Sequence, residues 1–393
     1  MNIKKQIAKI YTLDFLGSFN LTNCVWLLLM VNRGFSLWEA GLAEGVFHLV
    51  SFLCEIPSGM AADLYGRRKT LCASWLVWGA SSVLMLLSTN ITGVCLAFGL
   101  NAFGFNLASG TREALTFDSL KQVGQEERYI SVSSWQNVLW RSSATISRLM
   151  AGVAILLGYR TCYLIHIGTS LVGACLSLTL TEAENGQPHS DKKLSLQQVA
   201  ADFTGQTGAV LSFLRDAPMV RAYMVSTALV SGTITLVGFF LQQHLSDIGA
   251  AGAVTLGPLL FCVSFGGIVG ARLAVRLYDL SFVKTFLLSG GCITVGMLLC
   301  GLPTVLLCVV GGFVMTMFDE VLCTVTEAKL NHMFPSEQRA SLVSVFSMCF
   351  SLSMIVLSPL LGALCSLLGI GRAFMIMAAF VACTLLFSAK RLT

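Results

Sequence analysis

Long apolar segments recur from one end of this chain to the other, and each is long enough to cross a lipid bilayer. A membrane-spanning helix needs about 20 predominantly apolar residues. Twelve segments meet this requirement, near residues 8–31, 37–62, 70–89, 91–117, 130–157, 160–181, 218–243, 253–276, 282–301, 303–328, 339–367 and 369–389. A membrane barrel would instead alternate polar and apolar residues over stretches of about ten. The segments therefore predict an all-α integral membrane protein with twelve transmembrane helices.

The composition excludes most water-soluble classes of protein. Charged residues make up 11% of the chain and hydrophobic residues 55%, whereas soluble domains carry about 25% charged residues. This argues against a soluble enzyme, a nucleic-acid-binding domain and a disordered chain. The 14 cysteines lie in apolar stretches, without a CxxC pair or a metal-ligand spacing. We interpret them as small packing residues and expect no metal site.

The basic residues predict how the chain is oriented in the membrane. If the N-terminus is cytoplasmic, 20 of the 25 Lys and Arg residues lie at cytoplasmic ends of the spans, and only Arg33, Arg160 and Arg372 lie outside. Cytoplasmic loops of membrane proteins are enriched in Lys and Arg. The pattern predicts a multi-pass protein of the cell membrane with both termini in the cytoplasm. Its basic surplus faces anionic lipid, so no nucleic acid is needed to explain it.

A polar stretch in the middle divides the spans six and six. We predict an N-terminal six-helix bundle over 1–181, a cytoplasmic linker over 182–217 and a C-terminal six-helix bundle over 218–393. The linker has apolar residues at helical spacing, which favours an amphipathic helix on the membrane surface over a regulatory domain. One shift of 211 residues relates Arg128 to Arg339 and Gly59 to Gly270. This indicates a parallel duplication, which is common among transporters.

The loop between the second and third segments carries the most specific motif. It reads Gly59-Met-Ala-Ala-Asp63-Leu-Tyr-Gly66-Arg67-Arg68-Lys69 and resembles the signature loop of the major facilitator superfamily (MFS), G-x-x-x-D-R-x-G-R-R/K. The resemblance implies the MFS fold, with two six-helix halves, and transport by alternating access.

In that family the loop is a cytoplasmic latch that holds the outward-open state. We expect Gly59 to let a neighbouring helix approach closely and Gly66 to permit a tight turn. The alternative is that the basic residues only anchor the topology. The latch candidates are Gly59, Asp63, Gly66, Arg67, Arg68 and Asp118, the last as the partner of Arg67.

The chain departs from the family pattern in ways that bear on the substrate. Leu64 replaces the usual basic residue, Ala274 stands where a second-half loop would carry its acid, and the Gly-Pro-rich motif of drug–proton antiporters is missing from the fifth segment. In contrast, Glu55-Ile-Pro57-Ser-Gly59 resembles a version found in efflux-type members.

Charged residues inside the apolar segments are candidates for ion coupling, because each costs at least about 2.5–3.5 kcal/mol on insertion scales. The resemblance implies that the first, fourth, seventh and tenth spans line the central cavity, and most of these acids fall on three of them. A buried carboxyl group favours its neutral form and can therefore load and release a proton. The proton-coupling candidates are Asp14, Glu113, Asp319 and Glu320.

Basic and polar residues of the same spans are candidates for substrate binding. Arg141 and Arg148 lie seven residues apart and share a helix face, and the seventh span carries polar residues at four-residue spacing. Internal ion pairing and helix–helix hydrogen bonding remain open as alternatives. The substrate-cavity candidates are Tyr11, Ser18, Arg112, Arg141, Arg148, Tyr223, Thr227 and Ser231.

These features predict a secondary active transporter of a small organic molecule. The first version is proton-coupled efflux of amphipathic compounds or drugs, and the second is a proton-coupled carrier of a defined organic anion or metabolite. The third is a non-transporting sensor or lipid-handling protein. The sequence has no Gly-rich phosphate loop and no catalytic constellation, so we expect no enzyme activity and no cofactor. The expected partners are a substrate, protons and membrane lipid, and the expected state is a monomer.

Overall fold

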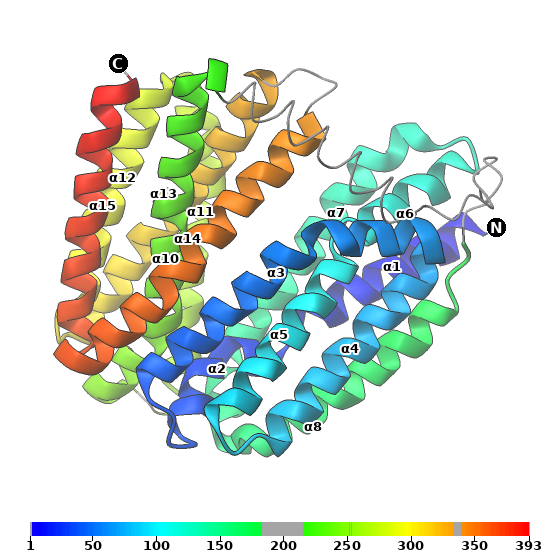
Figure 1. Ribbon diagram of the computed structural model, residues 1–393, viewed down its shortest axis with the longest axis horizontal. Helices are drawn as coiled ribbons and strands as arrows, with labels where there is room; N and C mark the ends of the chain where they lie inside the picture. The colour runs from blue at the N-terminus through cyan, green and yellow to red at the C-terminus, as the bar shows by residue number, and fades with distance from the viewer. Residues whose placement is uncertain (1, 183–214, 251, 253, 334–338, 393) are drawn as a thin grey trace. The chain divides into compact units, whose positions relative to one another are not determined.

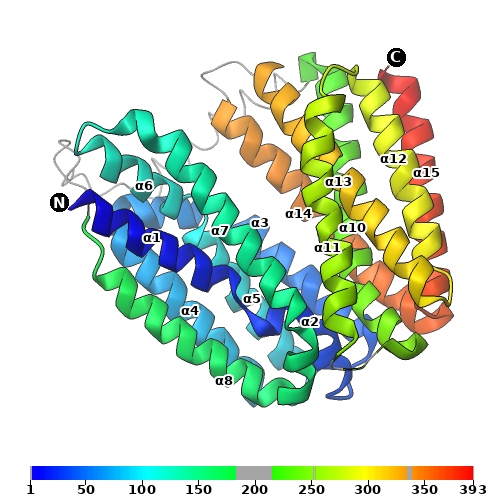
Figure 2. The same ribbon diagram turned by 180° about the vertical axis from the view of Figure 1, so that it is seen from behind.

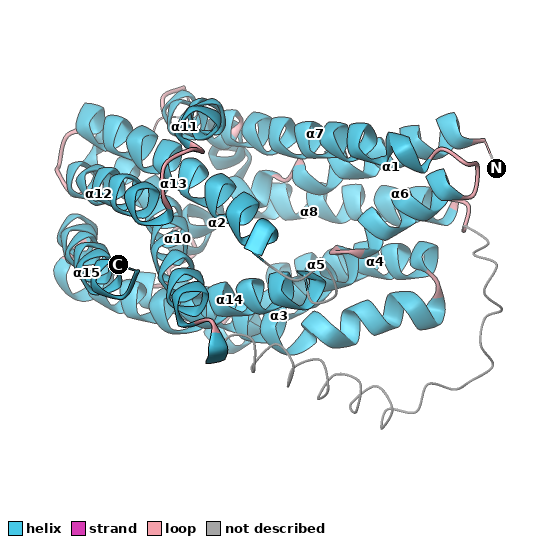
Figure 3. Cartoon of the chain, turned by 90° about the horizontal axis from the view of Figure 1, so that it is seen from above, coloured by secondary structure: helices cyan, strands magenta, loops and turns pink. Residues whose placement is uncertain are grey.

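Helices account for nearly all of the chain that the computed structural model describes, namely residues 2–182, 215–250, 252, 254–333 and 339–392 (Figure 1). The α-helices are α1 (Ile3–Ser18), α2 (Leu21–Val31), α3 (Leu37–Tyr65), α4 (Arg67–Leu87), α5 (Ile91–Ala108), α6 (Thr111–Lys121), α7 (Tyr129–Leu149), α8 (Ala151–Leu178), α10 (Pro218–Leu245), α11 (Leu256–Leu277), α12 (Phe282–Cys300), α13 (Val305–Met333), α14 (Arg339–Leu368) and α15 (Ile370–Leu392). A short 3-10 helix, η1 (Glu126–Arg128), and a short π-helix, η2 (Ser246–Ala250), complete the described elements. Figure 3 shows no strand in the described ranges, so the prediction of an all-α fold is confirmed.

Eleven helical stretches of the described chain are long and apolar enough to cross a membrane. The predicted fifth span is not among them, because α7 carries Arg141, Arg148 and several serines. Gly158 adopts a φ of 73° and interrupts α8 between the predicted fifth and sixth spans. The count of twelve spans and the orientation of the termini stay predictions.

The described chain divides into two compact units. Unit 1 consists mainly of Met1–Gly186 and includes α1 to α8. Unit 2 consists mainly of the later residues, although 249–261 and 358–363 group with unit 1. The linker predicted over 182–217, with its amphipathic helix, lies outside the described residues except for its two ends.

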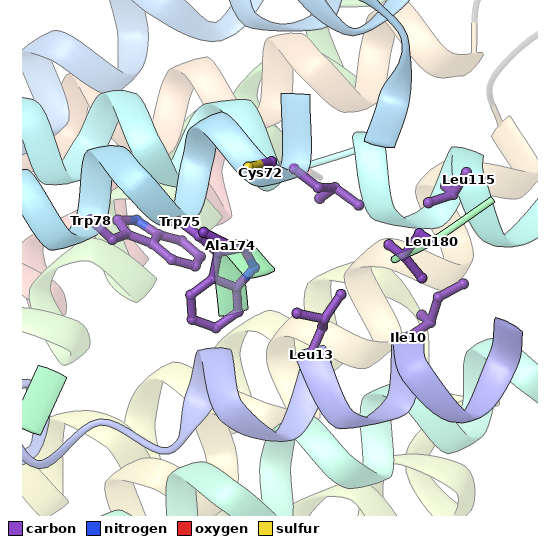
Figure 4. Close-up of a cluster of buried hydrophobic side chains, with 9 residues drawn as sticks. Ile10, Leu13, Cys72, Trp75, Trp78, Leu115, Ala174 and Leu180 are labelled. Atoms are coloured by element: carbon purple, nitrogen blue, oxygen red, sulfur yellow. The ribbon is translucent and has the colours of Figure 1, made fainter. Parts of the chain in front are cut away.

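Unit 1 is built around buried tryptophans. Trp75 and Trp78 of α4 meet edge to face, with ring centroids 5.1 Å apart. Figure 4 shows Leu13 of α1 beside these rings, together with residues from α6 and α8. The indole of Trp75 also lies against Gly173 of α8, where any Cβ would overlap the ring. α1 also lies along α7 (Figure 2).

Two apolar segments of unit 1 are broken into separate helices. The segment predicted near 8–31 forms α1 and α2, because Asn20 caps α2 by accepting a 2.9 Å hydrogen bond from the Thr22 amide. The segment predicted near 91–117 forms α5 and α6, which meet at Gly110 with a φ of 73°. Broken membrane helices are tolerated where they line a protein cavity, and they often carry binding sites. The breaks lie six residues after Asp14 and two residues before Arg112.

Unit 2 is held together by close helix packing. A Cβ built on Gly296 of α12 would lie 2.7 Å from the carbonyl oxygen of Gly311 on α13, so only glycine allows this crossing. Gly270 of α11 approaches α13 in the same way, against the backbone of Met317. α10 packs against α12, α13 and α15, and most of its side chains are buried.

Candidate functional site

The charged residues of the predicted first and fourth spans meet inside unit 1. Asp14 is 1% exposed, and its Oδ1 lies 3.0 Å from Nε of Arg112. Arg112 extends its Nη2 to Oε1 of Glu113, 2.9 Å away. One arginine therefore serves two carboxylates, and the three side chains together carry one excess negative charge when both acids are ionised.

Two residues of α7 complete this cluster, and the sequence analysis did not single them out. Gln136 donates from Nε2 to Oδ2 of Asp14 at 3.0 Å. The guanidinium carbon of Arg112 lies 4.9 Å from the ring centroid of Trp140, in cation–π contact. Gln136 and Trp140 are four residues apart, so one face of α7 presents both of them to α1 and α6.

Tyr11 and Ser18 bind the backbone of α7. Ser18 donates to the Trp140 carbonyl at 2.8 Å, and the Tyr11 hydroxyl reaches the Val132 carbonyl at 3.5 Å. These contacts favour the helix-packing alternative for both residues. Arg141 and Arg148 are exposed and lie outside the cluster around Asp14.

A narrow cavity borders the Arg112 side of this cluster. It is lined mainly by apolar residues, among them Leu13, Trp75, Trp78 and Trp140. Its volume is about 20 Å³, which is enough for one water molecule and too small for an organic substrate. In this conformation the cavity is part of the packed core of unit 1.

The acid of the predicted tenth span meets the polar stripe of the predicted seventh span inside unit 2. Ser231 of α10 donates to Oδ1 of Asp319 on α13 at 3.2 Å. Cys323, one turn further along α13, places its Sγ 3.6 Å from the same oxygen and 3.4 Å from the Ser231 hydroxyl. No basic side chain pairs with Asp319 within the ranges that the structure describes.

The rest of the stripe continues along α10. Tyr223 accepts a 3.0 Å hydrogen bond from Thr326 of α13, and its ring packs against Phe282 with centroids 4.5 Å apart. Thr227 is fully buried, and its hydroxyl has no hydrogen-bond partner among the described residues. Two members of the stripe predicted from sequence, Tyr223 and Ser231, therefore contact α13.

Glu320 lies apart from its neighbour Asp319. It accepts a hydrogen bond of 3.4 Å from Thr324, and its Cβ lies near Gly270 of α11. Adjacent residues of a helix project about 100° apart, so the two acids face different neighbours.

The signature loop joins α3 to α4 through Gly66, whose φ of 89° fits the tight turn expected there. Arg67 forms an ion pair with Asp118 of α6 and donates to the Ala114 carbonyl at 2.7 Å. The predicted contact between Arg67 and Asp118 is therefore present. Its role as a latch stays a prediction.

Of two other latch residues, Gly59 lacks its expected contact in the described chain, and Asp63 is not tested. A Cβ on Gly59 would meet no atom of the described chain within 4 Å. Among the described residues, no helix makes the close approach expected at Gly59, although its counterpart Gly270 has one. The side chain of Asp63 lies outside the described part of the chain.

A carboxylate that the sequence analysis missed caps α4. Glu182, at the end of the sixth span, accepts hydrogen bonds from the backbone amides of Arg67 at 2.7 Å and Arg68 at 2.9 Å. A carboxylate at a helix N-terminus is stabilised by the unpaired amides and the helix dipole. Gln6 of α1 fixes the approach of this segment through two hydrogen bonds to the backbone of Thr181.

A second buried pair lies on α3, where Nε2 of His48 is 3.3 Å from Oε1 of Glu44. The spacing of four residues was visible in the sequence, but Glu44 was not singled out.

No group of three or more His, Cys, Asp and Glu residues in the described chain could hold a metal ion.

Comparison with known proteins identifies the family. The sequence matches the Major Facilitator Superfamily over residues 8–318 and 273–392. The chain belongs to this family of membrane transport proteins.

The matches to two curated relatives cover only part of the length of each of those proteins. The chain is 29% identical to the inner membrane transport protein YajR of Escherichia coli (strain K12), over 25% of this chain and 22% of that protein. It is 22% identical to a putative tartrate transporter of Agrobacterium vitis, over 72% of this chain and 66% of that protein.

Solved structures share the whole fold at low sequence identity. The nucleoside transporter NupG aligns over 100% of this chain and 99% of its own, with a TM-score of 0.80 and 14% identity. A bacterial homologue of the human lysosomal transporter Spinster, inward-facing and occupied, aligns over 99% and 96%, with a TM-score of 0.76 and 14% identity. These similarities support the fold alone.

Proposed function

We propose that the chain is a secondary transporter that couples movement of a small organic molecule to movement of protons. The observation that carries the proposal is the setting of Asp319. This acid lies within the tenth span and is held by a hydroxyl and a thiol, with no basic partner among the described residues. Membership in the family supports the transport part of the proposal.

Neutral neighbours let a carboxyl group change its charge. The hydroxyl of Ser231 can donate to a carboxylate, and it can rotate to accept from a protonated carboxyl group. Asp319 can therefore gain or lose a proton without breaking an ion pair. Asp14 differs, because its protonation would remove one of the two carboxylates that pair with Arg112. We therefore rank Asp319 first as the coupling acid and place Asp14 and Glu113 second.

For the substrate, we favour export of small amphipathic compounds. The segment from Glu55 to Gly59 supports this version through its resemblance to efflux-type members. The second candidate is a carrier of an organic anion. The positive charges of Arg141 and Arg148 on α7 favour it, because they can attract an anion, as does the name of the tartrate relative.

The test begins with a thermal-shift screen of purified protein against dyes, antibiotics, nucleosides and organic acids. A compound that stabilises the chain is then followed in proteoliposomes. We expect Asp319→Asn to abolish transport driven by a pH gradient while counterflow exchange continues, and Glu320→Gln to keep both. If Asp319→Asn keeps gradient-driven transport, the coupling assignment is wrong.

The latch is a separate part of the proposal. We propose that the signature loop, through Asp63 and the pair of Arg67 with Asp118, limits the rate of conformational exchange. Asp63→Asn and Asp118→Asn should slow turnover while substrate still binds. Normal turnover in both variants would exclude the latch.

A further inference from the structure

Two arginines from distant parts of unit 1 meet on one tyrosine. The guanidinium carbon of Arg33 lies 4.7 Å from the ring centroid of Tyr159 and 5.2 Å from that of Phe35. Arg160 donates from Nε to the Tyr159 hydroxyl at 3.1 Å. Two positive charges are thus gathered at one place on the molecule.

This cluster lies at the opposite end of unit 1 from the signature loop. Arg33 donates to the carbonyl of Ser88, which directly follows α4, whereas Arg67 begins α4. A helix of 21 residues is about 31 Å long at 1.5 Å per residue, close to the thickness of the hydrocarbon core of a bilayer. The cluster therefore lies near the other membrane boundary, which the predicted topology places outside the cell.

No carboxylate balances these charges within the described residues. The ion pairs of that part of the chain include neither Arg33 nor Arg160. The acid nearest in sequence, Glu39, is engaged by the amide and hydroxyl of Ser36 at 2.7 and 2.9 Å. Basic residues are disfavoured outside the membrane, and two of the three predicted there come together at this point.

Arg160 offers exposed donors to a ligand, and Arg33 has a further N–H group without an acceptor in the described chain. Nη1 of Arg33 is buried and has no hydrogen-bond partner in the described chain, while its Nη2 is fixed by the Ser88 carbonyl. The side chain of Arg160 is exposed, and only its Nε is engaged, by Tyr159. A guanidinium held against aromatic rings is already oriented, and its planar fork matches the oxygens of a phosphate or carboxylate.

We propose that Arg33, Tyr159 and Arg160 form a binding site for one phosphate or carboxylate group. The site lies at the membrane boundary that the predicted topology places outside the cell. The group belongs to an anionic lipid headgroup or to a soluble anion, since both present the same oxygens. The inference does not depend on proton coupling or on the direction of transport.

The experiment uses the full-length chain in nanodiscs of phosphatidylcholine. One arm replaces a minority of this lipid with phosphatidylglycerol, and the other adds inorganic phosphate at constant ionic strength. We expect one of the two anions to raise the unfolding temperature of the wild type by several degrees. The double variant Arg33→Gln/Arg160→Gln should lose this shift, and Arg372→Gln, the third outer arginine, should keep it.

The outcomes distinguish the two possible sources of the anion, and they show whether the proposal holds or fails. A shift with phosphatidylglycerol alone assigns the site to a lipid headgroup, and a shift with phosphate assigns it to a soluble anion. Because Arg33 also ties two turns together, the single variant Arg160→Gln is included and should reduce the shift by at least half. The proposal is overturned if neither anion stabilises the wild type, or if the Arg160→Gln and double variants respond as the wild type does.

Discussion

The two units hold their membrane acids in different ways. In unit 1, Asp14 faces the guanidinium of Arg112 at 3.0 Å and the amide of Gln136 at 3.0 Å. In unit 2, Asp319 faces a hydroxyl at 3.2 Å and a thiol at 3.6 Å. The first acid is therefore held in an ion pair, whereas the partners of the second in the described chain are all neutral.

The difference extends beyond the acids. Unit 1 uses charged contacts at several points, including the pair of Arg67 with Asp118 and the cap that Glu182 places on α4. Unit 2 relies on close backbone crossings at Gly270, Gly296 and Gly311. We infer that charge contributes more to the stability of unit 1 than to that of unit 2. In unit 2, we infer that Asp319 stays available for proton exchange.

The largest effect is expected from Arg112→Ala. It leaves the carboxylate of Asp14 buried without its cation, and removing one partner of a buried pair costs about 3–5 kcal/mol. The unfolding temperature in detergent should fall strongly, and Arg141→Ala, at an exposed arginine, should change it far less.

A double variant tests whether the loss comes from the pair. Asp14→Asn/Arg112→Ala removes both charges and should recover part of the loss, because no uncompensated carboxylate remains. Purely additive effects of the two substitutions would contradict the contribution of this ion pair.

Gly270→Ala should give the next largest effect, this time in unit 2. The added Cβ would collide with the backbone at Met317 and lie 2.9 Å from the Cβ of Glu320, and overpacking costs about 1–3 kcal/mol. Gly267→Ala is the matched control on the same helix, because no described atom lies within 4 Å of its Cβ position. Equal unfolding temperatures for the two variants would contradict close packing as the main support of unit 2.

The sequence predicted the helices and the acids because both depend on local properties. Apolar length identifies a span, and a charged residue inside it is conspicuous. The polar stripe of the seventh span followed from its spacing of four residues, which places Tyr223, Thr227 and Ser231 on one face. These features need no knowledge of how the helices pack.

The partners of these residues were harder to predict. Gln136 and Asp14 are 122 positions apart, and Glu182 and Arg67 are 115 apart, so only the packing of helices brings them together. Gln136 carries no charge and looked like an ordinary polar residue. The helix breaks had local signals in Asn20 and Gly110, since Asn favours N-caps and Gly favours positive φ. Apolar runs on both sides concealed these signals.

Glu182→Ala should have a smaller effect than either of the preceding variants. It removes the carboxylate that accepts from two amides at the start of α4, and loss of a helix cap costs about 1 kcal/mol. Glu182→Gln keeps an acceptor but loses the charge, so its unfolding temperature should lie between those of Glu182→Ala and the wild type. A Gln variant as unstable as the Ala variant would show that the charge, more than the hydrogen bonds, supports this end of unit 1.

The smallest effect on stability is expected from Asp319→Asn, the substitution that should remove proton coupling. The amide oxygen of Asn can still accept from Ser231, and no arginine loses a counter-charge, so the free energy of unfolding should change by less than about 1 kcal/mol. Asp14→Asn is the matched comparison, because it leaves Arg112 with one carboxylate where it had two, and it should be the less stable of the two variants. If Asp319→Asn proves as destabilising as Arg112→Ala, then Asp319 has a charged partner in the folded protein. In that case the two acids would be held alike, and the reason for placing proton exchange at Asp319 rather than Asp14 would be lost.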